Sequence, residues 1–343
     1  MISFSIPVLL RKERKEDSIK NVGPNALCLA CKEGKQRTVL RLLEYGVDVN
    51  TCDEKTGNSP LTLACTEGHY RIAELLLKHM ADVNLCTKTE TSPLYVACQN
   101  GDYSTAELLL KHKADVNLCT ETGISPLYVA CQNGDYSTAK LLLKHKADVN
   151  LRRGTGASPL YVACQNGHVD TADLLLANEA SKNLCTNTRN SPLYAACQNG
   201  HKESVKFLMN KAADVDLWTQ TGISPLYVAC QNGHVDTAEL LLAKGASTNL
   251  CTNTRKSPLY AASQNGHKDT VQLLLNKGAD VNLCTETGAS PFYAALQKRQ
   301  YPVAEHLLMN GAKVNWSKKK RARLVSEAYK NGHDSVMLKT LLK

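Results

Sequence analysis

The chain has 343 residues, of which 43% are hydrophobic and 21% charged, so it can bury a large core and is not a disordered polypeptide. No run of eighteen apolar residues occurs, which argues against a membrane-spanning helix. The net charge is +9, but residues 21–315 hold 28 basic and 27 acidic side chains, so the excess lies at the two ends. A near-neutral body has no basic stripe to track phosphates, and we expect no nucleic-acid ligand.

The first twenty residues form a mixed-charge, mainly basic segment before any regular pattern begins. Met1 to Leu10 is apolar but is interrupted by Pro7, and the basic residues follow the apolar stretch. A secretory signal has the opposite order. The chain also carries 14 cysteines without an evident pairing scheme, which suits a reducing compartment. We therefore predict a cytoplasmic or nuclear protein.

From residue 21 onward the sequence repeats with a strict period. Ser-Pro dipeptides begin every 33 residues, at Ser59, Ser92, Ser125, Ser158, Ser191, Ser224, Ser257 and Ser290. A string close to S-P-L-Y-V-A-C-Q-N-G is followed by a segment ending in L-L-L and then by A-D-V-N-L-C-T. This period predicts an array of about nine stacked units over residues 21–343.

One unit contains the signals for two helices and a loop. Ser125 is a good N-cap and Pro126 suits the first helical position, while Gly134 ends the helix. A second helix begins at Asp135, and the extended A-D-V-N segment after it leads to a turn at Gly156. Helices this short are unstable alone. The units must therefore stack, each with a hairpin-like loop projecting from it.

These strings resemble the ankyrin repeat, whose first helix starts Thr-Pro-Leu-His and whose second ends Leu-Leu before Gly-Ala-Asp-Val-Asn. The resemblance covers roughly residues 21–343. It implies an all-α repeat solenoid of helix-turn-helix units with projecting β-hairpin-like loops. It also implies that the chain binds other proteins through its loop tips and the concave face of its first helices.

Two positions depart from the ankyrin pattern. Tyrosine replaces the signature histidine in seven units, from Tyr95 to Tyr293, so the hydrogen bond usually made by that histidine is made differently or lost. The glycine that ends the second helix is replaced in five units, by Met80, Lys113, Lys146, Glu179 and Ala212. A left-handed conformation there costs about 1 kcal/mol per residue. We therefore predict that the stretch from about 60 to 220 is locally softer.

The terminal units differ from the others. The first, Ala26 to Asn50, lacks Ser-Pro and is one residue out of phase, and residues 317–343 form a degenerate last unit with Leu324 in place of proline. Polar terminal repeats cover an otherwise open core. We predict capping units, although a fragment of a longer array would look the same.

The cysteines lie in two columns, one in the first helices and one in the loops. Ser263 and Leu296 replace members of the first column, and Arg152 and Trp218 replace members of the second. Packing positions tolerate such exchanges, whereas a metal site does not. No second C-x-x-C pair accompanies Cys28 and Cys31. We predict neither a metal nor a cofactor.

No catalytic motif stands out from the repeat. Six histidines follow a unit's glycine at the start of a second helix, where Asp102 and Asp135 stand in sister units, so we assign them a polar helix-start role. The phosphate-binding, nucleophile-elbow and zinc-protease motifs are missing from the sequence. We predict that the chain is not an enzyme.

Three short motifs have both a modification or targeting interpretation and a structural one. The Ser-Pro pairs resemble proline-directed phosphorylation sites, but helix capping explains them. The resemblance implies possible hydroxylation of the loop residues Asn50, Asn84, Asn117, Asn150 and Asn282 by an oxygen-sensing dioxygenase. Alternatively, these amides brace the loops. The run containing Lys318, Lys319, Lys320, Arg321 and Arg323 is either a nuclear import signal or a solvated loop.

Two sets of residues are candidates for partner binding. The first is a ladder of amides at the ends of the first helices, able to bond an extended peptide: Gln132, Asn133, Gln165, Asn166, Gln198 and Asn199. The second lies in the later loops, which are basic while the earlier ones are acidic or mixed: Arg152, Arg153, Arg189, Trp218, Arg255 and Lys256. An exposed Trp beside Arg is typical of a binding hot spot. Solvated loop charges are the alternative.

We therefore predict a monomeric, non-catalytic scaffold or adaptor for a protein partner with an acidic segment. Two other functions stay open. One is a substrate-recognition adaptor of a ubiquitin ligase, although no recruitment box is evident after residue 330. The other is a nuclear regulatory factor that uses the basic run 318–323.

Overall fold

The computed structural model describes residues 25–314, 317, 322–323 and 326. Contacts divide the chain into two compact units, which are described in turn: unit 1 comprises residues 1–159 and 173–180, and unit 2 comprises residues 160–172 and 181–343. Within the described residues the chain is helical, and no strand is assigned. None of the described helices has the length and apolar character needed to cross a bilayer.

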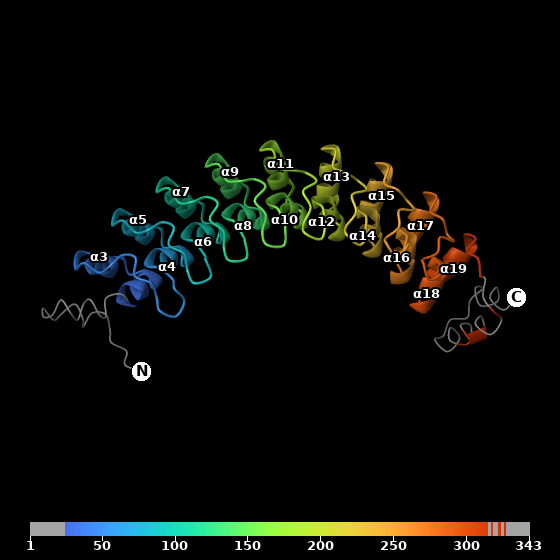
Figure 1. Cartoon of the computed structure of the whole chain (residues 1–343), viewed down its shortest axis with the longest axis horizontal. Coiled ribbons are helices and arrows are strands. Elements are labelled where there is room, and N and C mark those ends of the chain that lie inside the picture. Colours follow the sequence, from blue (N-terminus) through green and yellow to red (C-terminus); the bar gives the residue numbers. More distant parts are fainter. Residues whose placement is uncertain (1–24, 315–316, 318–321, 324–325, 327–343) are drawn as a thin grey trace. The chain divides into compact units, whose positions relative to one another are not determined.

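Unit 1 has its helices in two rows, as Figure 1 shows. Residues 25–32 are helical, and the first helices that follow in the same row are α4 (Pro60–Thr66), α6 (Pro93–Gln99) and α8 (Pro126–Asn133). The second helices are α3 (Gln36–Glu44), α5 (Tyr70–Lys78), α7 (Tyr103–Lys111) and α9 (Tyr136–Lys144). Each first helix packs on the second helix of its own repeat and on the next first helix. This is the predicted stacking of helix-turn-helix repeats.

Unit 2 follows the same plan. Its first helices are α12 (Pro192–Gln198), α14 (Pro225–Gln231), α16 (Pro258–Asn265) and α18 (Pro291–Gln297). Its second helices are α13 (Lys202–Asn210), α15 (Val235–Ala243), α17 (Lys268–Asn276) and α19 (Tyr301–Met309). The remaining helices, α10 (Pro159–Gln165) and α11 (Val169–Ala177), contribute residues to both units. The predicted all-α repeat fold is confirmed.

The serine of each Ser-Pro pair caps a first helix, as predicted. Ser125 Oγ accepts a hydrogen bond from the backbone N–H of Tyr128 at 3.1 Å, and Pro126 occupies the first turn. The same bond recurs at Ser59, Ser92, Ser191, Ser224, Ser257 and Ser290. Each cap contributes about 1 kcal/mol. Ser125 is only 1% exposed, which supports the capping interpretation over a surface phosphorylation site.

The core of each repeat is made by leucine, alanine and cysteine of the first helix. Leu127 is 1% exposed, while Ala130 and Cys131 are fully buried. Burial raises the pKa of the thiols of Cys65 and Cys98 far above its ordinary value, so both stay neutral. No group of His, Cys, Asp and Glu within the described residues could hold a metal ion. Because the first-helix cysteines are buried among apolar side chains, they contribute to the packed core.

The five residues that replace glycine after the second helix are all left-handed. Their φ angles lie between 57° and 67°: Met80, Lys113, Lys146, Glu179 and Ala212. The hydrogen bonds match those of a glycine repeat, because Lys146 N donates to Leu143 O at 2.9 Å and Gly245 N donates to Leu242 O at 3.1 Å. The conformation is thus confirmed, while the local softness stays a prediction.

Histidine and aspartate share the helix-start position but make different bonds there. Asp102 Oδ1 accepts from the backbone N–H of Thr105 at 3.0 Å within its own helix. His234 makes no such cap. Its Nε2 lies 3.1 Å from the backbone oxygen of Gln198 in the preceding repeat. The ring nitrogens of His69, His234 and His267 thus lie within hydrogen-bond distance of a backbone oxygen of the preceding repeat, and these side chains do not cap their own helices.

Candidate interaction surface

Each loop between repeats reverses the chain through its own hydrogen bonds. In unit 2, Thr219 N donates to Ile223 O and Thr252 N donates to Lys256 O, both at 3.0 Å. The side chain of Thr219 also accepts the backbone N–H of Ile223 at 3.1 Å. These turns produce the hairpin-like loops that the sequence predicted, although no strand is assigned in the described residues.

Adjacent loops of unit 2 are joined into a row. Gln220 N donates to Thr188 O at 3.1 Å, and Asn253 N donates to Thr221 O at 3.0 Å. The side chain of Gln220 adds a bond from Nε2 to Asn187 O at 2.9 Å. The loops therefore present their side chains from a connected framework, which lowers the entropy that ordering them for a partner would cost.

The loop asparagines also connect repeats. Asn117 Oδ1 accepts the backbone N–H of Asp148 at 2.9 Å, and Asn282 Oδ1 accepts that of Lys313 at 2.8 Å. Asn50 and Asn84 make the equivalent bonds. The Nδ2 of Asn150 lies 3.5 Å from Glu179 O. This is the bracing role that the sequence analysis left open, whereas hydroxylation of these side chains stays a prediction.

Two of the predicted basic residues occupy the tips of the loops in unit 2. Arg189 and Arg255 are exposed and have left-handed backbones, with φ of 62° and 57°. Sister loops have Gly123 or Gly222 at the same turn position, and glycine adopts this left-handed conformation without a steric penalty. The chain thus presents two guanidinium groups at positions where a non-glycine residue is strained by about 1 kcal/mol.

The other two predicted residues of unit 2 flank these tips. Trp218 replaces the loop cysteine and is 47% exposed. Lys256 is half-buried, with its Nζ 5.8 Å from the centre of the Tyr260 ring. Trp218 belongs to the loop between those of Arg189 and Arg255, so the three side chains come from successive loops of one row. The apolar and basic residues of the predicted site therefore lie on successive loops of unit 2, and their joint role stays a prediction.

In unit 1 the two predicted arginines have different surroundings. Arg152 is exposed. Arg153 is half-buried, with its guanidinium 5.7 Å from the centre of the Tyr128 ring and its Nε buried without a hydrogen-bond partner among the described residues. It takes the place of the loop's first threonine, such as Thr120. Arg153 therefore belongs to the face of the first helices and not to a loop tip, which the sequence analysis missed.

The predicted amide ladder is partly used to hold repeats together. Asn133 Nδ2 donates to Gln99 O at 2.9 Å in the preceding repeat, and Asn199 Nδ2 donates to Ala195 O at 3.1 Å in its own helix. Asn166 is exposed. Among the glutamines, Gln132 and Gln198 are exposed and Gln165 is half-buried. The side chains of Asn133 and Asn199 are therefore already hydrogen-bonded within the fold.

The predicted nuclear import run lies mostly outside the described residues. Lys318, Lys319, Lys320 and Arg321 are not described, and Arg323 is exposed and helical. The degenerate last unit, including Leu324, also lies largely outside the described part of the chain. The import signal and the capping role therefore stay predictions.

Comparisons with known proteins agree with this architecture. The family model for ankyrin repeats (3 copies) matches residues 5–87, 80–153, 145–218, 160–252 and 226–318. The crystal structure of the ankyrin repeat domain of human ASB11 is similar, with a TM-score of 0.60 and 30% identity over 65% of this chain and all of that one. No curated protein matches the chain. Stacked ankyrin repeats form protein-interaction scaffolds, and the repeat-by-repeat match shows that this chain belongs to the ankyrin repeat family.

Proposed function

We propose that the chain is a non-catalytic scaffold that binds an acidic segment of a partner polypeptide through the loops of unit 2. Arg189, Arg255 and Lys256 supply positive charge, and Trp218 supplies an apolar anchor. The observation that carries the proposal is the left-handed backbone of the two exposed arginines, because strained residues that the fold does not need mark functional sites.

The charge at this turn position differs between the two units. Glu90 has a φ of 57° in unit 1, where unit 2 has arginine. Opposite charges at one structural position favour a role in recognition over a role in folding, because the backbone requirement is the same in both. Clustered guanidinium groups pair well with carboxylates, so an acidic segment is the complementary partner.

We also propose a separate contact on the first-helix face of unit 1. Arg152 and Arg153 lie in unit 1, and the buried Nε of Arg153 has no hydrogen-bond partner among the described residues. The exposed Arg152 supplies positive charge there for a carboxylate of a bound peptide.

The test is a double charge reversal at the loop tips, Arg189→Glu with Arg255→Glu. Glutamate is compatible with this backbone, because Glu90 already adopts it. A tagged wild-type chain is used to capture partners, and the affinity of the purified partner is then compared. We expect binding to weaken at least tenfold, since each reversal replaces an attraction with a repulsion, and Trp218→Ala to weaken it further.

The matched control reverses two exposed lysines on second helices of unit 2, Lys206→Glu with Lys268→Glu. It makes the same change in net charge away from the loops and should leave affinity within twofold. Equal affinity of the wild type and the loop variant would refute the site. Capture of ubiquitin ligase subunits that is insensitive to the loop variant would instead support the adaptor function. Nuclear accumulation of a reporter carrying residues 316–343 would support the nuclear one.

A further inference from the structure

The second helices of unit 1 end in a basic turn that unit 2 lacks. α7 and α9 both run into the tripeptide Lys-His-Lys, at residues 111–113 and 144–146, and all six side chains are exposed. The corresponding residues after α15 and α17 in unit 2 are Ala-Lys-Gly at 243–245 and Asn-Lys-Gly at 276–278. The two units therefore present different charges at the same place in the repeat.

The fold does not require lysine at the last position of this turn. Lys113 and Lys146 are left-handed, with φ of 65° and 64°, where unit 2 has Gly245 and Gly278. The backbone bond is the same for both residue types, because Lys113 N donates to Leu110 O at 3.0 Å and Gly278 N donates to Leu275 O at 3.1 Å. A lysine here adds strain without adding a backbone bond. Its side chain is therefore the part that needs an explanation.

The ammonium groups of this turn are little used by the fold. Among the described residues, Lys113, Lys144 and Lys146 form neither an ion pair nor a side-chain hydrogen bond. Lys111 is paired with a glutamate of its own helix at 2.9 Å. We call these four lysines the basic ridge. Three of its four charges are free to meet a partner.

One exchange between two nearly identical repeats makes the second of them more basic. Residues 134–151 repeat the sequence around α7 except that Lys140 replaces Glu107. In α7, Glu107 accepts the ammonium of Lys111. In α9, Lys144 stands at the position of Lys111 and has lost that acidic neighbour on its own helix. The positive charge of the ridge is therefore greatest at α9.

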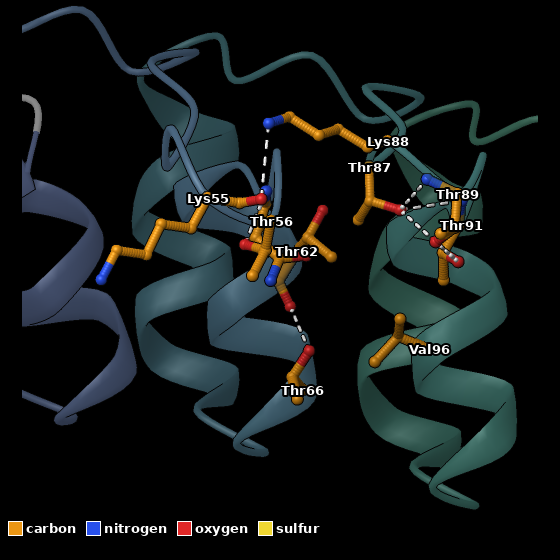
Figure 2. Close-up of a pocket in the computed structure, with 10 residues that line it drawn as sticks. Lys55, Thr56, Thr62, Thr66, Thr87, Lys88, Thr89, Thr91 and Val96 are labelled. Atoms are coloured by element: carbon orange, nitrogen blue, oxygen red, sulfur yellow. Dashed lines mark hydrogen bonds between the residues drawn. The ribbon is translucent and has the colours of Figure 1, made fainter.

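A lysine in a loop of unit 1 shows the opposite case. Lys88 Nζ donates to Glu54 O at 2.6 Å, and Figure 2 shows its side chain reaching across to the loop of Lys55. This ammonium is used to link two loops of the fold. The basic ridge makes no such link and belongs to the row of second helices, which Figure 1 shows on the side of unit 1 away from the loop tips.

The surroundings of the ridge indicate which anion it suits. Glu74 and Glu107 interrupt the positive charge along the second helices, so there is no continuous basic stripe for a polyphosphate backbone. At the left-handed position, the preceding repeat has Met80, which is 83% exposed, and the following repeat has Glu179. An acidic polypeptide segment lying on the ridge meets an apolar side chain at one end and is repelled at the other.

We propose that the basic ridge binds an acidic segment of a second polypeptide, with Lys113 and Lys146 as its main contacts. Lysine places a point charge on a flexible stem, which suits carboxylates that are not held in one geometry. The inference goes beyond the proposed function, because it adds a surface on the second helices of unit 1, whereas the scaffold contact uses the loops of unit 2. The chain then holds acidic segments at two separate surfaces.

The test measures binding of a fluorescein-labelled oligoglutamate peptide to the full chain by fluorescence anisotropy at low ionic strength. Arg189→Glu with Arg255→Glu first removes the loops of unit 2 from the measurement. In this background, Lys113→Glu with Lys146→Glu should weaken binding about tenfold, because each reversal replaces an attraction with a repulsion. Glutamate is compatible with this backbone, because Glu179 adopts it with a φ of 67°.

Two controls separate charge at this turn from other effects of substitution. Lys113→Arg with Lys146→Arg keeps the charge and should bind within twofold, and Arg299 with a φ of 60° shows that arginine adopts this conformation. Lys244→Glu with Lys277→Glu makes the same change in net charge directly after second helices of unit 2. It should also leave affinity within twofold. Circular dichroism checks that each variant is folded.

Carbodiimide coupling of the peptide carboxylates to lysine, mapped by mass spectrometry, locates the contact. We expect coupling at Lys113, Lys144 and Lys146 to exceed coupling at Lys244 and Lys277. Equal affinity of the background chain and the ridge reversal, or an equal loss in the unit 2 control, overturns the proposal. Anionic vesicles or single-stranded DNA that respond to the ridge reversal when the peptide does not also overturn it. Failure of the loop site leaves these outcomes unchanged, because the loops are already reversed in the background.

Discussion

The left-handed residues after the second helices allow a direct test of how backbone strain is distributed along the chain. Lys113 and Lys146 are exposed and have φ of 65° and 64°. Replacing both by glycine removes no buried surface and leaves the backbone hydrogen bonds intact, since Gly245 makes the same ones. The substitution therefore changes the free energy of unfolding mainly through the backbone conformation.

The expected gain follows from two opposing effects. A left-handed conformation costs an L-residue roughly 1–2 kcal/mol, while glycine loses about 0.5–1 kcal/mol more conformational entropy on folding. The net gain is about 0.5–1 kcal/mol per site, and about 1–2 kcal/mol for Lys113→Gly with Lys146→Gly. The two sites lie in different repeats and should add.

Urea unfolding measures the total gain in the free energy of unfolding, and hydrogen exchange shows which helices are stabilised. Because each repeat contacts only its neighbours, slower exchange should appear in α7 and α9 and not in distant helices. Ala212→Gly in unit 2 isolates the backbone effect, because alanine has almost no side chain to lose. The reverse change Gly245→Lys should destabilise by a similar amount.

The reasoning would be refuted if Lys146→Ala stabilised as much as Lys146→Gly, because the gain would then come from removing a charge. It would also fail if amides next to Gly245 and Gly278 exchanged faster than those next to Lys113 and Lys146. That outcome would contradict the prediction that the repeats from about 60 to 220 are softer.

The remaining predictions concern caps, loops and titration. Ser224→Ala should lower the free energy of unfolding by about 1 kcal/mol in urea melts, because Tyr227 N loses its acceptor; an unchanged midpoint would contradict the capping role. Asn117 Oδ1 accepts the backbone N–H of Asp148, so Asn117→Ala should speed the amide exchange of Asp148. The control variant Asn253→Ala, which lies in another loop, should leave the exchange of Asp148 unchanged. Burial raises the pKa of Tyr227 to about 12, against about 10 when unfolded. The neutral phenol therefore stabilises the fold below pH 10, and this contribution is lost as the pH rises through 12. Burial also raises the pKa of Tyr95, Tyr194 and Tyr260, so Tyr227→Phe should lower the amplitude of the late tyrosinate absorbance by one group, and an unchanged amplitude would refute the assignment.

Much of the fold could be predicted because its signals are local. Ser125 and Pro126 define the start of a first helix, and Gly134 defines its end, within ten residues of chain. The left-handed state of Lys146 could be predicted by comparison with glycine in sister repeats, because the helix ending requires it whatever residue is present. The identity of the interacting loops could also be proposed, since their charges vary while the helices do not.

The contacts that the sequence alone did not show all join residues about 25 to 37 positions apart. His234 bonds the preceding repeat and not its own helix, Asn133 links to Gln99, and Arg153 lies over the Tyr128 ring. The period of 33 residues determined that the repeats stack, because a short helix cannot bury its apolar face alone. Only the tertiary structure decided which side chains meet between repeats, because this depends on the spacing between stacked repeats.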